Sequence, residues 1–192
     1  MKKGFSRIAF EFMSIVIAVL LALFLTESRQ NYLNKQQAKK TFRAIQNEVS
    51  DNLELIRLDS VDHLGKLEKV NLWLSADEDY RDTVHFDLEI IHSLTKSTAW
   101  EVAKLNQMIL HMPEEAVMAI SRVYTMQQFY DQNGRDMYGQ MTDIVKGVKG
   151  SDTIEGAITA FGYELVKETT SVTTLKQTYE EFLAKYPIES AD

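Results

Sequence analysis

The chain of 192 residues has no cysteine, only two prolines and only eight glycines. Without cysteine, the sequence excludes a disulfide-stabilised scaffold, a thiolate zinc site and a cysteine nucleophile. The scarcity of proline and glycine argues against a collagen-like or loop-rich fold. A cysteine-free chain fits the cytoplasm and the periplasm equally well, so composition excludes classes of fold and leaves the compartment open.

Motifs for catalysis and cofactor binding are also missing. The sequence has no GxSxG, no HExxH, no glycine-rich phosphate loop and no Walker lysine. His85 and His92 would lie about 10 Å apart along a helix, too far to share one metal ion without other ligands. The methionines between Met108 and Met141 have a spacing more typical of core filling than of a copper site. We therefore predict no enzyme activity, no cofactor and no metal site.

The chain does contain one long apolar run, at residues 8–25. As a helix this run is about 27 Å long, close to the hydrocarbon thickness of about 30 Å. A cleaved signal peptide would have small residues just after the run, but Leu23, Phe24 and Leu25 follow Ala22. The sequence therefore predicts a short tail at residues 1–7 and an uncleaved, single-pass transmembrane helix at residues 8–26.

Charge divides the rest of the chain. The net charge is −7, to which residues 1–26 contribute +2 and residues 27–43 contribute +4, leaving −13 for residues 44–192. We predict a basic juxtamembrane stalk at 27–43 and an acidic helical body at 44–192. An acidic body of this size argues against nucleic acid as a partner. The stalk suits anionic lipid headgroups, although its cations could equally form the solvated stripe of a helix. The predicted headgroup contacts are Arg29, Lys35, Lys39 and Lys40.

The orientation of the anchor follows from cations on both flanks. Lys2, Lys3 and Arg7 precede the span, and the stalk cations follow it, so the two counts nearly tie. A short tail with three cations and the terminal amine resists translocation. We therefore predict that the amino terminus is inside and that the body is extracytoplasmic.

Small side chains recur on one face of the predicted span. Ser14, Ala18 and Ala22 are four residues apart, the pattern that lets a second transmembrane helix approach closely. Glu11 falls near the same face, where a carboxylate in lipid costs about 2 to 3 kcal/mol unless paired or hydrated. Arg7 lies one turn earlier and can pair with Glu11. The pattern predicts a helix–helix seam, with Glu11 either in a charge pair at the headgroup boundary or as an ion-handling carboxylate.

The body reads as a series of long helices. Helical spacing of apolar residues predicts that the anchor continues outward through residues 26–76. Residues 86–111 read as one or two helices, the second starting at a capping box of Thr98 and Glu101. Trp100, in the first turn of that helix, is expected to be buried among apolar neighbours.

Two more helices are predicted after these. One begins at Pro113, with candidate kinks at Gly134 and Gly139, and ends at 147–150. The other covers 154–186, with a capping box of Asp152 and Glu155, a candidate break in the threonine-rich stretch 169–174, and a stop at Pro187. No segment alternates with period two. The prediction is an all-α fold: an N-terminal transmembrane helix extended into a long stalk helix, with an antiparallel helical bundle.

Three stretches of the sequence resemble a known group of proteins. They are residues 11–23, with the run SIVIAVLLAL at 14–23, residues 45–53 (IQNEVSDNL) and residues 98–101 (TAWE). They resemble uncharacterised bacterial single-pass membrane proteins with an N-terminal anchor and a helical soluble body. The resemblance implies the bacterial inner membrane as the location and supports the same architecture, but it carries no activity.

These observations favour a non-enzymatic accessory or scaffold subunit that packs with other components of a membrane protein complex. Its expected partners are membrane lipids and either other transmembrane subunits or further copies of itself. One alternative is a small homo-oligomer that handles ions or protons through Glu11. Another is an anchored sensor whose ligand pocket is lined by Trp73, Trp100 and Tyr124.

Overall fold

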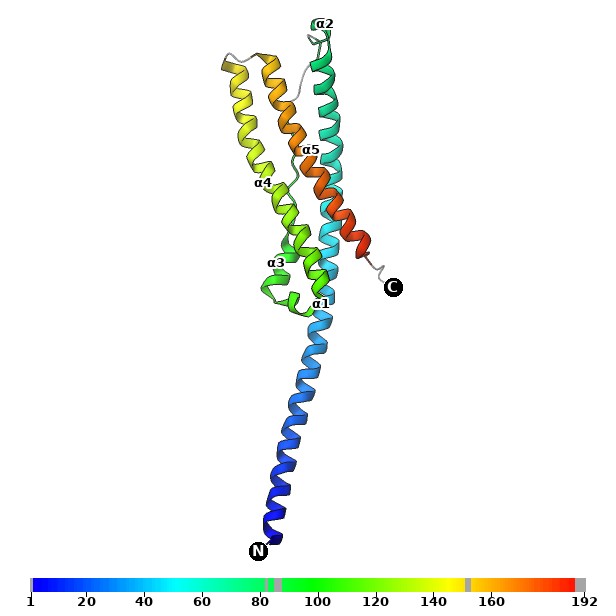
Figure 1. Cartoon of the computed structure of the whole chain (residues 1–192), viewed down its shortest axis with the longest axis vertical. Coiled ribbons are helices and arrows are strands. Elements are labelled where there is room, and N and C mark those ends of the chain that lie inside the picture. The colour runs from blue at the N-terminus through cyan, green and yellow to red at the C-terminus, as the bar shows by residue number, and fades with distance from the viewer. Residues whose placement is uncertain (1, 82, 85–87, 151–152, 189–192) are drawn as a thin grey trace.

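A computed structural model describes residues 2–81, 83–84, 88–150 and 153–188, and their side chains except at 2–9, 145 and 147–150. The elements in chain order are α1 (Lys2–Ser75), α2 (Glu78–Arg81), α3 (Thr98–Leu105), the 3₁₀ helix η1 (Met108–His111), α4 (Glu114–Gly150) and α5 (Ile154–Lys185). No strand occurs in these residues. The predicted all-α fold is confirmed (Figure 1).

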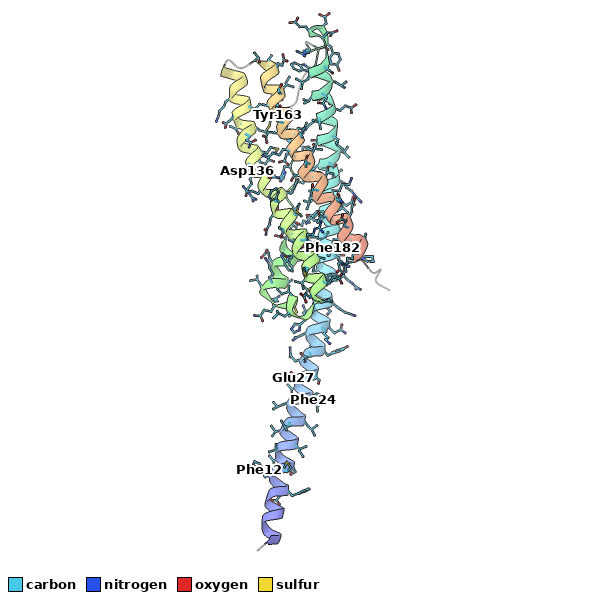
Figure 2. All side chains as sticks on the ribbon, in the orientation of Figure 1. Phe12, Phe24, Glu27, Asp136, Tyr163 and Phe182 are labelled. Atoms are coloured by element: carbon cyan, nitrogen blue, oxygen red, sulfur yellow. The ribbon has the colours of Figure 1, made fainter. Side chains whose placement is uncertain are left out.

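The first helix, α1, joins the apolar run to the body without a break. Its 74 residues make a helix about 110 Å long. The apolar window near its start is long and hydrophobic enough to cross a membrane, and none of that window is buried within the protein. Phe12 and Phe24 project from a stretch of α1 that no other element reaches (Figure 2). The predicted apolar helix that continues into a long stalk is therefore present.

Beyond the stalk, α1, α4 and α5 form a three-helix bundle. α5 packs against both α1 and α4. α1 and α4 run away from the anchor and α5 runs back toward it, so α5 is antiparallel to both (Figure 1). The chain can place α1 and α4 in the same direction because residues 88–97, here named the return segment, bring it back along the bundle before α3 begins.

The core of the bundle consists of two apolar clusters. The cluster nearer the anchor includes Ile45, Ile56, Ile120 and Tyr179, all of them fully buried or nearly so. The cluster farther from the anchor is built around Val70, Trp73, Met137, Phe161 and Leu165. Between the two, along α1 and α5, lie buried polar side chains: Asp59, His63 and Glu168, with His92 from the return segment.

The prediction of helix throughout residues 86–111 is wrong for the return segment. Residues 88–97 are not helical, because side chains of α1 and α4 bind their backbone groups in place of an internal helical ladder. The predicted capping box at Thr98 is also wrong. The N-cap of α3 is Ser97, with no side-chain cap bond, and Glu101 instead pairs with Lys104 at 2.8 Å.

The predicted break within α5 is absent, and neither of the candidate kink positions interrupts α4. α4 continues as one helix through Gly134 and Gly139. α5 continues through the threonine-rich stretch, where four hydroxyls donate to carbonyls one turn earlier and so remain satisfied within the helix: Thr169, Thr170, Thr173 and Thr174. Thr153 caps α5 by accepting a hydrogen bond from the Gly156 amide, whereas Asp152 of the predicted capping box is outside the described residues.

The aromatic residues proposed for a ligand pocket do not share one. Trp100 is buried, as predicted, and stacks on Tyr124 with ring centroids 5.7 Å apart. Both rings belong to the cluster nearer the anchor, whereas Trp73 belongs to the other cluster. The sensor hypothesis therefore needs a different ligand site.

Candidate functional site

A groove of about 1010 Å³ opens at the end of the bundle nearest the anchor. Three parts of the chain form it: residues 35–46 of α1, the turn at 110–116 between η1 and α4, and the end of α5 with Tyr186 and Pro187. Figure 1 shows the start of α4 and the end of α5 at this level of α1. We name this feature the cationic groove.

The Lys and Arg side chains of the groove lining give it its charge. Five cationic side chains line it: Lys35, Lys39, Lys40, Arg43 and Lys185. The described lining residues include no aspartate or glutamate. The structure describes no ion pair for the first three lysines. Like charges one helical turn apart, such as Lys35 and Lys39, repel each other. The groove therefore favours an anion that would relieve this repulsion.

Lys185 is already paired with an acidic side chain. The Lys185 ammonium donates to the Glu115 carboxylate at 2.5 Å. This hydrogen bond lowers the pKa of Glu115 and raises the pKa of Lys185. Because both side chains are exposed, solvent screening leaves the pair little net effect on stability. This pair joins α4 and α5 at the edge of the groove. The lysines of α1 are therefore the main candidates for binding an anion.

The apolar wall of the groove is held in place by aromatic contacts and an amide. The Phe42 ring lies 5.5 Å from Tyr186 and 6.3 Å from Phe182, measured between centroids. Phe182 sits among packed side chains where the end of α5 meets α1 (Figure 2). Gln46 donates from its amide to the carbonyls of Tyr186 and Pro187, at 2.9 and 3.1 Å. These contacts fix the end of α5 against α1 and so give the groove a defined shape.

A row of buried polar side chains, here named the polar seam, positions the elements above the groove. It consists of Glu48, Asn52 and Asp59 of α1 with Gln127 of α4. Glu48 accepts from the Ala99 amide at 2.9 Å, close to the start of α3, where the helix dipole favours a negative charge. Asn52 binds both the amide and the carbonyl of Lys96. Asp59 accepts from the amide and the hydroxyl of Ser93, both at 2.8 Å.

Three tyrosine hydroxyls complete the seam. Tyr124 donates to Glu48 at 2.6 Å, Tyr130 to Asp59 at 2.7 Å and Tyr179 to Gln127 at 2.8 Å. Burial raises the pKa of all three phenols well above the ordinary value. The neighbouring carboxylates raise the pKa of Tyr124 and Tyr130 further, since a phenolate beside them would face a second negative charge. The seam is therefore built to hold neutral phenols.

The second group of buried polar side chains is less well satisfied. The Nδ1 atom of His92 lies 3.4 Å from a carboxylate oxygen of Glu168, and the structure gives both ring nitrogens and both carboxylate oxygens no hydrogen-bond partner. His92 stacks on Tyr130 with centroids 4.1 Å apart and faces Gly134. No cluster of three or more His, Cys, Asp or Glu suited to a metal ion occurs in the part of the chain that the structure describes.

The structure brings some of the predicted site residues together and leaves others apart. Lys35, Lys39 and Lys40 all line the groove, whereas Arg29 lies on the exposed stalk below it. Ser14, Ala18 and Ala22 are exposed along the anchor, and their role as a seam stays a prediction. Glu11 is exposed too, but the side chain of Arg7 is outside the described residues, so the predicted pair is not tested.

Sequence reasoning missed the rest of the groove. Gln46 and Tyr186 are 140 residues apart in the sequence, and no local pattern indicates that they meet. The one available signal was Phe42, which begins the helical apolar spacing of α1 although it lies in the basic stalk. An aromatic residue among lysines at that point marks where the helix enters the bundle.

Comparison of the chain with known families, curated proteins and solved structures finds no match. The resemblance to anchored bacterial membrane proteins therefore stays a prediction.

Proposed function

We propose that this chain is a non-enzymatic, membrane-anchored accessory or scaffold subunit that packs against other components of a membrane protein complex. The observation that carries the proposal is the continuity of α1, which runs from Lys2 to Ser75 and supplies both the apolar run and one of the three bundle helices. A flexible linker would be enough to tether an independent domain. A continuous helix instead ties the orientation of the body to that of the anchor.

The surfaces that the chain leaves uncovered support the same proposal. None of the apolar window is buried within the protein, and its small-residue face is available to a second helix. Higher on α1, Leu58, Val61 and Leu72 are each more than half exposed on the side away from the core. Both surfaces lie on the same helix, so one rigid element would present both to a partner.

The experiment is photocrosslinking in native membranes from a non-natural residue at position 22, on the same face as Ala18, followed by identification of the crosslinked species. The proposal expects a stoichiometric partner protein. Ala18→Leu should insert normally but weaken this crosslink through bulk alone, whereas Ala9→Leu changes a position off the Ser14–Ala18–Ala22 register and serves as the control. A chain that stays monomeric, or an assembly unaffected by Ala18→Leu, would contradict the assigned seam.

Continuity itself is tested by two insertions after Ser28. Two alanines keep the helix but rotate the body by about 200° relative to the anchor, while seven alanines rotate it by only about 20°. A scaffold should lose assembly with two alanines and keep it better with seven. A Gly-Ser insertion that leaves assembly intact would show that α1 is only a tether.

Glu11→Gln separates this function from the ion-handling alternative. The amide keeps the size of the side chain and most of its hydrogen-bonding capacity but removes the charge. A scaffold should assemble unchanged, whereas a proton- or cation-handling oligomer should assemble and lose ion flux in vesicles.

A further inference from the structure

The cationic groove stands above the membrane surface. Lys35, the first lining residue, follows Leu25 by ten residues, which is about 15 Å along a helix. A bilayer of about 40 to 45 Å with a hydrocarbon core of about 30 Å leaves a headgroup layer of about 5 to 8 Å on each side. Arg29 therefore reaches the headgroups of a membrane spanned by residues 8–25, while the groove lies beyond that layer.

The groove combines two kinds of surface that an amphiphile needs. The α1 lysines supply positive charge, and their side chains tilt toward the helix N-terminus, which is toward the membrane. Phe42, Leu110, Met112 and Tyr186 supply an apolar wall beside them. A volume of about 1010 Å³ is at the upper end of the range of small-molecule sites, so the groove has room for more than a phosphate ion.

We propose that the cationic groove binds one anionic phospholipid that has been lifted out of the leaflet on the body's side of the membrane. The phosphate lies against Lys35, Lys39 and Lys40, and the first part of the acyl chains lies against Phe42 and Tyr186. The chain thus holds a lipid above the bilayer surface. This goes beyond the proposed scaffold role and does not depend on the identity of any protein partner.

Charge complementarity and wall chemistry favour a phospholipid over an acidic peptide. The described lining residues come from helices and the short turns at their ends, so the groove presents no strand edge to which an extended peptide could add. An aromatic and aliphatic wall next to three lysines, for which the described residues give no ion pair, matches a molecule with a charged head and an apolar tail. Anchoring also keeps phospholipid at high effective concentration near the groove.

The test is isothermal titration calorimetry on the full chain in nanodiscs of phosphatidylcholine, with empty nanodiscs as the blank. The probes are dihexanoyl phosphatidylglycerol, dihexanoyl phosphatidylcholine, sodium phosphate and a hexaglutamate peptide, each below its aggregation limit. We expect saturable one-to-one binding of the phosphatidylglycerol only. Equal binding of the phosphatidylcholine, of free phosphate or of the peptide would overturn the proposal, and so would absence of phosphatidylglycerol binding.

Charge-neutralising variants then locate the site. Each cation near a phosphate is worth about fivefold in affinity, so Lys39→Gln with Lys40→Gln should weaken phosphatidylglycerol binding about 25-fold. Lys69 lies on an exposed face of α1 far from the groove, so Lys69→Gln should leave the affinity for phosphatidylglycerol unchanged. All three side chains are exposed, and an unaltered circular dichroism melt confirms folding. Equal affinity of the double variant and the natural chain would show that the lipid binds elsewhere.

Discussion

The lower and upper parts of α1 belong to one helix but have opposite surfaces. In the lower part, the apolar side chains of residues 10–25 are exposed, with Phe24 at 65%. In the upper part, polar side chains such as Asn52 and Asp59 are buried, while Leu58 and Val61 are exposed at about 70%. Hydrophobicity alone therefore does not tell which side of α1 faces the core.

The difference shows what holds each part in place. The buried Asn52 and Asp59 of the upper part have partners in the return segment, and Asp59 also accepts from Tyr130 of α4, so the burial of these two side chains does not leave their hydrogen bonds unmade. None of the apolar window in the lower part is buried within the protein, and its apolar surface on all sides fits a lipid environment. The predictions below test this contrast.

The largest effect is expected where an apolar side chain replaces a polar seam residue. Asp59→Leu removes the acceptor of the Tyr130 hydroxyl and of the Ser93 amide and hydroxyl. Leaving these buried donors unsatisfied should lower the free energy of unfolding by about 3 to 5 kcal/mol. Leu58→Gln, one residue away on the exposed face, should change it by less than about 0.5 kcal/mol. Urea unfolding followed by circular dichroism measures both, and equal losses would refute the assigned faces of α1.

A smaller effect is expected where the return segment meets α4. A Cβ atom at position 134 would lie 2.2 Å from ring atoms of His92, so Gly134→Ala must displace a buried ring. We expect a loss of about 1 to 3 kcal/mol. At Gly139, in the same helix, an added Cβ would meet nothing within 4 Å, so Gly139→Ala should stabilise by about 0.5 to 1 kcal/mol. Thermal melts of the pair give the sign of each change, and a stabilising Gly134→Ala would contradict this packing.

The polar seam also predicts sensitivity to alkaline pH. The pKa values of Tyr124, Tyr130 and Tyr179 are raised in the folded state by burial, so the unfolded chain loses these protons first as the pH rises. Their contribution to stability is complete below the ordinary tyrosine pKa of about 10 and falls above it, by about 1.4 kcal/mol per pH unit for each tyrosine. Unfolding curves between pH 9.5 and 11 should show this slope, and Tyr130→Phe should reduce it by about one third. An unchanged slope would place the Tyr130 hydroxyl in solvent.

The smallest effect is expected for buried polar groups that lack partners. His92 and Glu168 make no hydrogen bond that their replacement would break. Replacing both, as His92→Leu with Glu168→Met, should change the free energy of unfolding by less than about 1 kcal/mol or increase it. Urea unfolding at pH 7 measures this free energy. A large decrease would show that His92 and Glu168 stabilise the bundle as much as the polar seam does.

Local signals in the sequence were enough for the helical framework. The apolar run, the helical spacing after it, Pro113 before α4 and Pro187 after α5 each act within a few residues, and the elements they predict are present. The return segment could not be predicted in the same way. Its backbone is held by residues far away in the sequence, such as Asn52, which lies 44 residues from Lys96. The apolar spacing in residues 86–111 therefore predicted a helix, whereas hydrogen bonds from these distant side chains hold residues 88–97 in a non-helical conformation.

The candidate site was predicted in part for a similar reason. Lys35, Lys39 and Lys40 stand out as a basic cluster in the sequence, so the sequence alone was enough to predict that they face anions. Their distance from the transmembrane span can be derived only when α1 is known to continue unbroken from the span to these lysines. The apolar wall depends on Tyr186, which Gln46 fixes from the other end of the chain, and helical periodicity carries no information about such a contact.

Cysteine labelling tests the prediction that the lower part of α1 lies in the membrane and that the bundle lies outside the cytoplasm. The chain has no cysteine, so single substitutions give clean signals. We expect a membrane-impermeant maleimide added to intact spheroplasts to label Asn47→Cys, on the exposed face of the bundle, and not Ala18→Cys, within the apolar run. Labelling of Ala18→Cys would contradict the membrane location of the lower part of α1. Labelling of Asn47→Cys only after lysis would contradict the location of the bundle outside the cytoplasm.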